Sequence, residues 1–170
     1  MKRFFSLFLC IIMIATCVGC TPPAEEIHSP VRFYYPKSKI DYGKENSVLD
    51  SEIREGYGKT ESPIALLNLY LDGPVNADLT NPFPTGSTIL SLTTTGEFVS
   101  VVISDAYASL SGLDLTIACA SLAKTVIEIT GVPNVMLRVD TLPLGSSRAI
   151  LLNQEMILLL DNSATETQPQ

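Results

Sequence analysis

The first 20 residues constrain this chain most, because they separate an export segment from the part that has to fold. Residues 2–3 are basic, residues 4–18 form an apolar run, and the small residue Gly19 stands directly before Cys20. These are the three parts of an export signal. The apolar run is shorter than the roughly 20 apolar residues of a membrane-spanning helix. The sequence therefore predicts that residues 1–19 are a signal peptide that is removed.

The tripeptide Val18-Gly19-Cys20 resembles the lipobox of bacterial lipoproteins. The resemblance implies that a diacylglycerol is attached to the sulfur of Cys20 and that cleavage leaves this cysteine as the new amino terminus. The position three before the cysteine is usually aliphatic in a lipobox, and here it is Cys17. A second frame, residues 14–17, supplies the aliphatic residue but has Thr where Gly or Ala is favoured, so Cys20 is preferred over Cys17. An uncleaved amino-terminal anchor is the remaining alternative.

Residues 20–170 have the length of one ordinary domain with a flexible lead-in. Residues 20–30 are polar and rich in proline, which suits a flexible spacer after a lipid anchor. Residues 31–161 are expected to form the domain, and residues 162–170, with little apolar content, are expected to be a disordered tail. We expect the chain to be lipid-anchored to the cell membrane on its extracytoplasmic face.

The chain is acidic, with a formal net charge of −7 at pH 7 that becomes more negative once the cations of the signal are removed. This balance opposes binding to nucleic acid or to an anionic membrane surface through a basic patch. Cys119 is the one thiol expected to stay free in the folded part, so no intramolecular disulfide framework can form. Its neighbours Ala118 and Ala120 favour a small core residue over a reactive thiol.

Periodicity and turn residues predict the element order β-α-β-β-α-β-β. The predicted elements are a strand at 31–35, a helix at 63–72, hairpin strands at 88–94 and 97–104, a helix that follows 111–114 and ends at Gly131, and strands at 135–140 and 155–160. Ser62 and Pro63 are expected to begin the first helix, and Thr95-Gly96 to form the hairpin tip. A further short extended piece is predicted at 48–54. Such an order gives an α+β fold, a small sandwich of one sheet with two helices on one face.

The longest predicted helix has one apolar stripe and a wetter side. The stripe is Leu115, Cys119, Leu122, Val126 and Ile129, and the wetter side is Asp114, Ser121, Lys124 and Glu128. Ile117, Ala120 and Ile127 widen the stripe, so this helix is either deeply buried or also meets a partner. Residues 111–114 have the spacing of a capping box. The strand predicted at 155–160 has five consecutive apolar residues, which suits either a central strand or an edge strand that pairs with a neighbour.

These motifs, in their order, resemble the GerMN domain, the sporulation and spore germination domain of bacterial lipoproteins. The series is Arg32-Phe33-Tyr34-Tyr35-Pro36, Leu66-Leu67, Leu71-Asp72-Gly73-Pro74, Pro84-Thr85-Gly86-Ser87, Thr95-Gly96, Ile103-Ser104-Asp105-Ala106-Tyr107 and residues 132–140. The resemblance spans residues 31–161 and implies a fold similar to the ring-building modules of secretion and sporulation complexes. It implies no catalytic residues. Residues 149–160 match no motif of the family.

The residue types needed for common active sites are absent or scattered. His28 lies in the predicted spacer, too far along the chain to pair with Cys119 or a serine inside the domain. Carboxylates gather near two cations in a segment best interpreted as a solvated loop, and they are Asp41, Glu45, Asp50, Glu52 and Glu55, with Lys44 and Arg54. Asp72, Asn76 and Asp78 lack the order of a calcium loop, and Pro74 interrupts them. We therefore expect no enzyme activity, no catalytic or metal site and no cofactor.

Two functions remain as expectations. The first is a non-catalytic, membrane-anchored lipoprotein that assembles or stabilises an envelope complex in sporulation or germination. The second is an extracytoplasmic module that binds and modulates a membrane sensor kinase. Both imply a protein partner or a homo-oligomer, together with the membrane through the lipid on Cys20, and neither implies nucleic acid or a small-molecule substrate.

Overall fold

The computed structural model describes residues 30–40, 48–55, 61–139 and 148–158. The predicted signal, Cys17, Cys20, His28 and the predicted tail lie outside the described residues. The strands are β1 Val31–Pro36, β2 Leu49–Arg54, β3 Ile89–Thr95, β4 Phe98–Ile103, β5 Asn134–Val139 and β6 Arg148–Asn153. The helices are α2 Pro63–Leu71, α3 Gly112–Thr130 and α4 Gln154–Leu158, and η1 Asp105–Ser109 is a short 3-10 helix.

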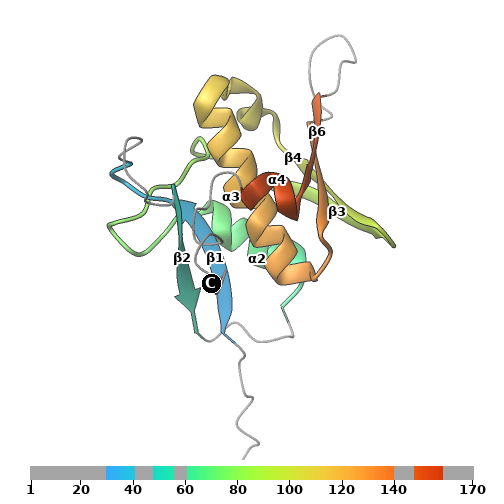
Figure 1. Ribbon diagram of the computed structural model, residues 1–170, viewed down its shortest axis with the longest axis horizontal. Helices are drawn as coiled ribbons and strands as arrows, with labels where there is room; N and C mark the ends of the chain where they lie inside the picture. The colour runs from blue at the N-terminus through green and yellow to red at the C-terminus, as the bar shows by residue number, and fades with distance from the viewer. Residues whose placement is uncertain (1–29, 41–47, 56–60, 140–147, 159–170) are drawn as a thin grey trace, which may run out of the picture.

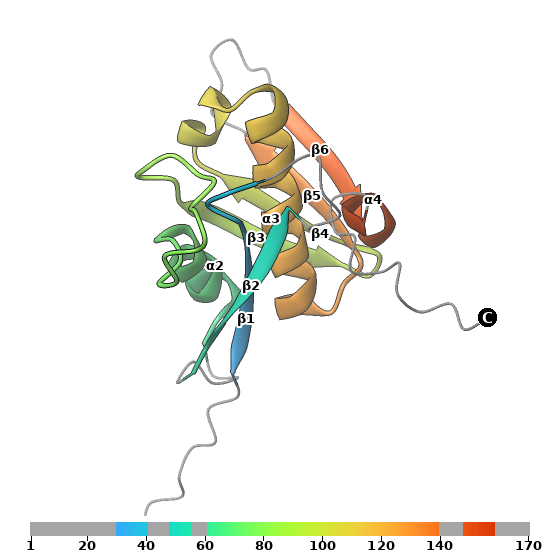
Figure 2. The ribbon, with the colours of Figure 1, turned by 60° about the vertical axis from the view of Figure 1, so that its left-hand side comes forward.

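The described elements form three layers, with helices between two sheets (Figure 1). β1 and β2 pair as a small antiparallel sheet, and the other sheet has the strand order β3-β4-β5-β6. Figure 2 shows α3 crossing between them, with β1 on one side and the larger sheet on the other. The predicted α+β class is confirmed. The strands, however, divide into two sheets where the sequence indicated one.

Burial on all sides of α3 explains the second sheet. Every residue from Ile117 to Ala123 is buried, although these seven residues turn through nearly two full turns of helix. A single sheet covers one side of a helix, so the opposite side of α3 needs β1 as a second cover. Of the two alternatives for this helix, the structure supports deep burial.

The strand pairings of the larger sheet decide which side chains face the helices. β3–β4 and β5–β6 are antiparallel, whereas β4–β5 is parallel and is connected through α3. The pairings bring Val101, Leu137 and Ile150 side by side on the face toward the helices. Val101 and Leu137 are fully buried, so this face of the sheet forms one half of the core.

Local signals account for most helix boundaries. The Ser62 hydroxyl accepts a hydrogen bond from the backbone N–H of Ala65, and Pro63 occupies the first turn of α2, as predicted. Gly131 ends α3 with a φ of 71°, a left-handed conformation that glycine adopts without strain. The capping box at Ser111 is wrong, because its side chain makes no capping hydrogen bond. Gly112 follows with a φ of 56°, so the first turn lacks the backbone geometry of a side-chain cap.

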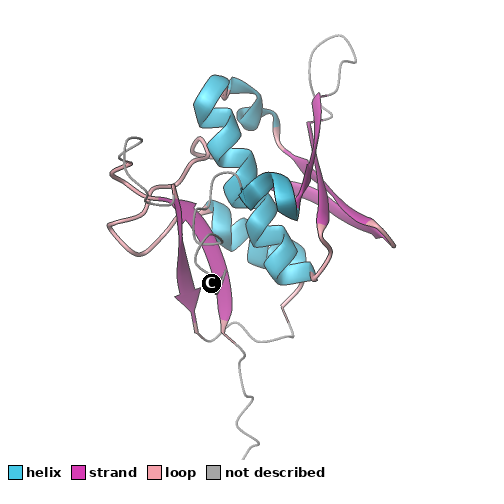
Figure 3. Cartoon of the chain, viewed as in Figure 1, coloured by secondary structure: helices cyan, strands magenta, loops and turns pink. Residues whose placement is uncertain are grey.

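The carboxy-terminal strand predicted at 155–160 is wrong. β6 lies earlier in the chain, and residues 154–158 form α4, as Figure 3 shows. The side chain of Asn153 accepts a hydrogen bond from the backbone N–H of Met156, which stabilises a helix start directly after the strand. The apolar run predicted a strand, but this cap decides where the strand ends. The hairpin tip is also shifted by one residue, because Thr95 pairs with Phe98 and leaves Gly96 and Glu97 as the turn.

Candidate protein-interaction surface

Cys119 is a core residue, as predicted. Its side chain is buried and its sulfur is in hydrogen-bond contact with the hydroxyl of Tyr107. Burial raises the pKa of the Cys119 thiol, which favours the unreactive protonated form. Burial likewise raises the pKa of Tyr107, so both groups stay neutral and serve packing.

Glu52 is not the solvated loop residue that the sequence indicated. Its carboxylate accepts hydrogen bonds from the backbone N–H groups of Val75 at 2.8 Å and Asn76 at 2.7 Å. It also pairs with the Nε of Arg54 at 2.6 Å, and the side chain is 10% exposed. Arg54 in turn donates to the carbonyl of Gly73 and lies over the ring of Phe33. Glu52 and Arg54 therefore hold the 73–76 turn against β2.

Partial burial by itself raises the pKa of Glu52, but the Asn76 N–H, Arg54 and the Val75 N–H together outweigh it and hold the pKa below its usual value of 4.5. A lowered folded-state pKa stabilises the fold above the unfolded pKa, and this stabilisation is lost as pH falls through the folded pKa. The other described carboxylates of that segment, Asp50 and Glu55, are exposed. Asp41, Lys44 and Glu45 lie outside the described residues.

Glu52→Gln should lower the free energy of unfolding by about 1.5–3 kcal/mol near neutral pH, because it removes the charge from three hydrogen bonds in a mostly buried site. The difference from wild type should shrink as pH falls below 4.5, where the wild-type carboxylate starts to protonate in the unfolded chain. Urea unfolding at several pH values measures both effects. Glu55→Gln, at an exposed position on the same segment, is the matched control and should change stability little. A pH-independent difference for Glu52→Gln would contradict this explanation.

The residues considered for a calcium loop shape a turn. The side chain of Asn76 accepts from the backbone N–H of Asp78 at 2.9 Å, while the N–H of Asn76 binds Glu52. Among the described residues, no three acidic, histidine or cysteine side chains come together as a metal site would need. These groups therefore belong to the framework of the fold.

Ser121 was predicted on the wetter side of the long helix, and it is fully buried. Its hydroxyl accepts a hydrogen bond from the hydroxyl of Tyr70 at 3.0 Å and donates to the carbonyl of Ala118. One turn further on, Thr125 accepts from the backbone N–H of Tyr34 at 3.0 Å and so binds α3 to the free edge of β1. The sequence offered no sign that Ser121 would be buried, because a serine on a helix is usually solvated. Its partner comes from a distant helix, α2.

A groove of about 560 Å³ lies between the segment after β1, the 80–84 loop and the start of α3. Its walls are mainly apolar or proline residues, among them Pro36, Ile40, Pro82, Phe83, Leu110 and Ile117. Lys37 and Asp114 are the ionisable side chains that line it. A groove of this kind suits apolar contact and lacks the convergent polar groups of an active site.

The face of the larger sheet that points away from the helices is the most extensive candidate surface. Alternate residues on each strand share this face. From β3 to β6, the strand pairings give three rows across it, which are Thr95, Phe98, Asn134 and Asn153; Thr93, Ser100, Met136 and Leu151; and Ser91, Val102, Arg138 and Ala149. We call these twelve residues the outer face. No described element covers it (Figures 1 and 2).

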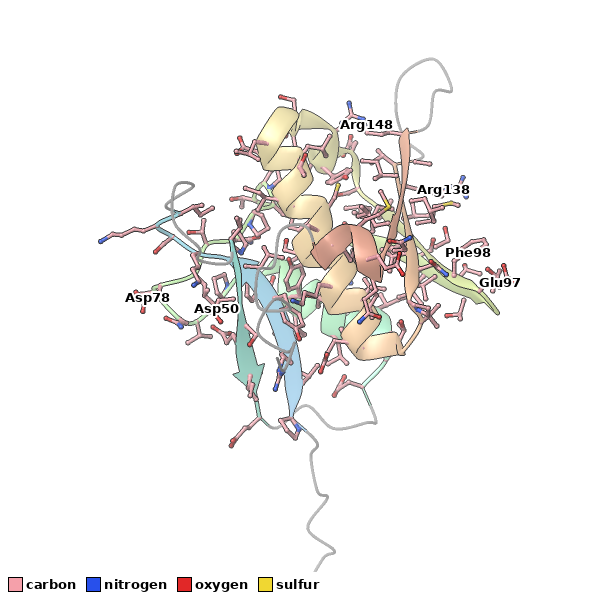
Figure 4. The ribbon with its side chains drawn as sticks, in the orientation of Figure 1. Asp50, Asp78, Glu97, Phe98, Arg138 and Arg148 are labelled. Carbon is pink, nitrogen blue, oxygen red and sulfur yellow. The ribbon has the colours of Figure 1, made fainter. Side chains whose placement is uncertain are left out.

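The outer face changes in character from one edge to the other. On β3 it carries the hydroxyl side chains of Ser91, Thr93 and Thr95, whereas toward β6 it carries Met136, Leu151 and Ala149. Leu151 is 56% exposed. Arg138 is the one ionisable side chain among the twelve residues, and it points away from α3 together with Phe98 (Figure 4). This surface is weakly charged and partly apolar, a composition typical of protein contacts and unsuited to polar catalysis.

The sequence contained part of this surface. Strands were predicted at 97–104 and 135–140, and in the observed β4 and β5 the alternation of buried and half-buried residues marks two faces. β6 was missed, because the strand was placed too late in the chain. With that error, Ala149 and Leu151 could not be assigned to the outer face.

Comparisons with known proteins identify a family and related structures for this fold. The family model Germane, described as sporulation and spore germination, matches residues 32–144. The first GerMN domain of the sporulation protein GerM from Bacillus subtilis has a TM-score of 0.55 at 14% identity, with 75% of this chain and 98% of that chain covered. The tandem GerMN domains of the same protein give 0.51 at 16% identity, with 74% of this chain and 43% of that chain covered. No curated protein matches the chain.

At these identities the likeness to the two structures concerns the fold alone, and the family match carries the assignment. That match spans more than half of the chain and includes strands β1 to β5 and helices α2 and α3. None of the described helices has the length and apolar content to cross a membrane. The sequence, the layered fold and the family match agree, and the chain belongs to the Germane family of sporulation and spore germination domains.

Proposed function

We propose that this protein is a lipoprotein anchored through Cys20 to the extracytoplasmic face of the cell membrane. Its domain acts as a non-catalytic protein-binding module in an envelope complex of sporulation or germination. The outer face is the observation that carries this function. It is a whole side of a four-stranded sheet that no described element covers, and nine of its twelve side chains are small, hydroxylated or apolar.

Physical chemistry favours a protein partner for such a face. The solvated face of a sheet usually carries polar and charged side chains. The central row of the outer face instead holds Thr93, Ser100, Met136 and Leu151. When a partner covers apolar side chains, the binding free energy gains about 25 cal/mol for each Å² of apolar surface removed from water. The near absence of charge on the twelve residues also lowers the cost of desolvation when a partner docks.

The anchor part of the proposal rests on the sequence of residues 1–20. β1 begins at Val31, so residues 20–30 would form the whole spacer between lipid and domain. A spacer of that length reaches at most about 40 Å when extended. The outer face would then meet partners that lie close to the membrane surface.

Cys20→Ala should abolish lipid attachment, whereas Cys17→Ala should leave it intact, because only the first removes the acceptor sulfur of the preferred lipobox. The measurement is the intact mass of the full chain purified from its host membranes. Loss of the lipid mass in Cys17→Ala alone would move the site to that residue. An unlipidated wild-type chain would overturn the anchor.

Met136→Glu should weaken partner binding about 30-fold, because a charge in the middle of the outer face costs about 2 kcal/mol of binding free energy when it is covered. The measurement is quantitative crosslinking of the full chain in membranes of sporulating cells. Leu113→Glu is the control, since Leu113 is 52% exposed at the start of α3 and lies outside the outer face. Equal crosslinking by wild type and Met136→Glu would refute the outer face as the binding surface. Crosslinks that persist in non-sporulating cells would favour the sensor-kinase function.

A further inference from the structure

The four sheet edges of the described fold differ in how they are protected. The free edge of β1 is covered by α3, where Thr125 accepts the N–H of Tyr34. β2 carries the charged residues Asp50, Glu52 and Arg54 along its length. β3 has an irregular register between Ile89 and Ser91, and Asn68 of α2 accepts the N–H of Ile89. Helix cover, charge and bulges are the devices by which proteins keep sheet edges from pairing with other chains.

Among the described residues, none of these devices protects the middle of β6. Its sequence from Ala149 to Leu152 is Ala-Ile-Leu-Leu, and it pairs with β5 in an unbroken register. No strand among the described residues pairs with its other edge. α4 packs against α3 and follows β6 at its end, so it lies on the helix side of the sheet. An apolar, regular, unpaired edge strand presents backbone N–H and C=O groups that a further strand can satisfy.

We infer that β6 pairs antiparallel with β6 of a second copy of this chain, which joins two larger sheets into one continuous sheet. A two-fold axis perpendicular to the sheet keeps the outer faces of both copies on one side. Residues that lie directly opposite each other in the two β6 strands must be on the same face of the sheet. The two residue numbers of each such pair therefore add up to an even number. The two registers with the most pairing are centred on Ile150 or on Leu151.

Charge selects the register centred on Leu151. A centre at Ile150 would put Arg148 opposite the apolar residue Leu152 of the second copy. A centre at Leu151 pairs Ile150 with Leu152 and Ala149 with Asn153, and it brings Arg148 to the first turn of α4 of the second copy. Glu155, an exposed residue, lies in that turn. Nη1 of Arg148 donates to the carbonyl of Leu110 at 3.3 Å within its own copy, so the other N–H groups of its guanidinium are the ones that would meet Glu155. In this register the strand is self-complementary, with apolar residues in the middle and opposite charges at the ends.

The same register also continues the outer face. Met136 and Leu151 are neighbours in its central row, and Leu151 would meet Leu151 of the second copy. The apolar end of each outer face then lies in the middle of the joined sheet, and the hydroxyl-rich β3 ends lie at its rims. This arrangement shields the most exposed large side chain of the outer face, which is 56% exposed in the single copy.

Disulfide crosslinking of the full chain tests the pairing in membranes of cells that express it. Leu151→Cys should form a covalent dimer about tenfold more efficiently than the controls, because the register holds two cysteines on one axis within disulfide reach. Ile53→Cys is the exposure-matched control, since Ile53 is 54% exposed on β2. Ala149→Cys is the register control, because it lies on the same face of β6 but faces Asn153 of the second copy. The parental chain shows what the native cysteines contribute.

The outcomes separate cleanly. A dimer specific to Leu151→Cys supports the inference, and adding Asn153→Cys to Ala149→Cys should restore crosslinking. Equal dimer from Leu151→Cys, Ile53→Cys and Ala149→Cys would show random collision and overturn it. Leu151→Lys, at an exposed position that a monomer tolerates, should convert the detergent-solubilised chain from dimer to monomer in light scattering. A wild-type chain that is monomeric there and gives no Leu151→Cys dimer also overturns the pairing. These results are independent of sporulation and of Met136→Glu, so the pairing and the proposed function can fail separately.

Discussion

Tyr70→Ala should lower the free energy of unfolding by about 3–5 kcal/mol, the range observed for removal of a buried aromatic ring. Tyr70 of α2 is fully buried at the centre of an aromatic cluster. Its ring stacks on that of Tyr35 of β1, with 4.6 Å between the ring centroids. It also makes edge contacts with the rings of Phe33 and Phe83, at centroid distances of 5.8 Å and 6.1 Å. Its carbonyl also accepts a hydrogen bond from the hydroxyl of Tyr35. Urea unfolding measures the loss.

Tyr70→Phe separates the ring from its hydroxyl. It keeps the stacking and loses the hydrogen bond to Ser121, so the expected loss is about 0.5–1.5 kcal/mol. Burial raises the pKa of Tyr70, which means that the hydroxyl is neutral and that no buried charge is lost. A Tyr70→Phe loss as large as that of Tyr70→Ala would show that the hydrogen bond, and not the ring, holds α2 to α3.

Leu122→Ala should lower the free energy of unfolding by about 2–5 kcal/mol, because the cavity cannot collapse when both neighbouring layers are fixed sheets. Leu122 is fully buried in the part of α3 that lies between them. Leu113→Ala is the matched control on the same helix, since Leu113 is 52% exposed, and its effect should stay below about 1 kcal/mol. Thermal and urea unfolding of both variants measure the difference. Similar losses at the two positions would mean that α3 is not enclosed on both sides.

These two predictions concern the framework that leaves the outer face exposed. α3 packs on the helix-facing side of the larger sheet, so the opposite side is left without a partner from the described chain. The buried polar contacts of Ser121 and Thr125 fix the helix against α2 and β1. Changes in this core should reduce partner binding only as far as they unfold the domain, whereas Met136→Glu acts on binding with the core intact.

The interior of the fold therefore serves stability, and its surface offers the groups for recognition. The pKa shifts of Cys119 and Glu52 are explained by packing and by a turn. The groups that could serve recognition lie on strands, at the outer face and along the edge of β6. Sites built on strands are more rigid than sites on loops, which suits a module whose contacts depend on shape.

The sequence by itself determined most of the local structure. Ser62 with Pro63 predicted the start of α2, Gly131 predicted the end of α3, and the β-rich runs predicted β1, β4 and β5, because each depends on neighbours a few residues away. It also determined the family, through an ordered series of motifs that the match over residues 32–144 confirms.

The tertiary structure alone decided how these elements divide into layers and which side chains face outward. Ser121 is buried because a tyrosine of α2 reaches it, and Glu52 is held because the 73–76 turn folds back on β2. The chain leaves β6 at Asn153, where a side-chain cap outweighs an apolar run. Each of these results depends on partners far apart in the chain or on competition between two local signals. The periodicity of a sequence reveals neither of these effects. The outer face exists because one long helix was enclosed from both sides.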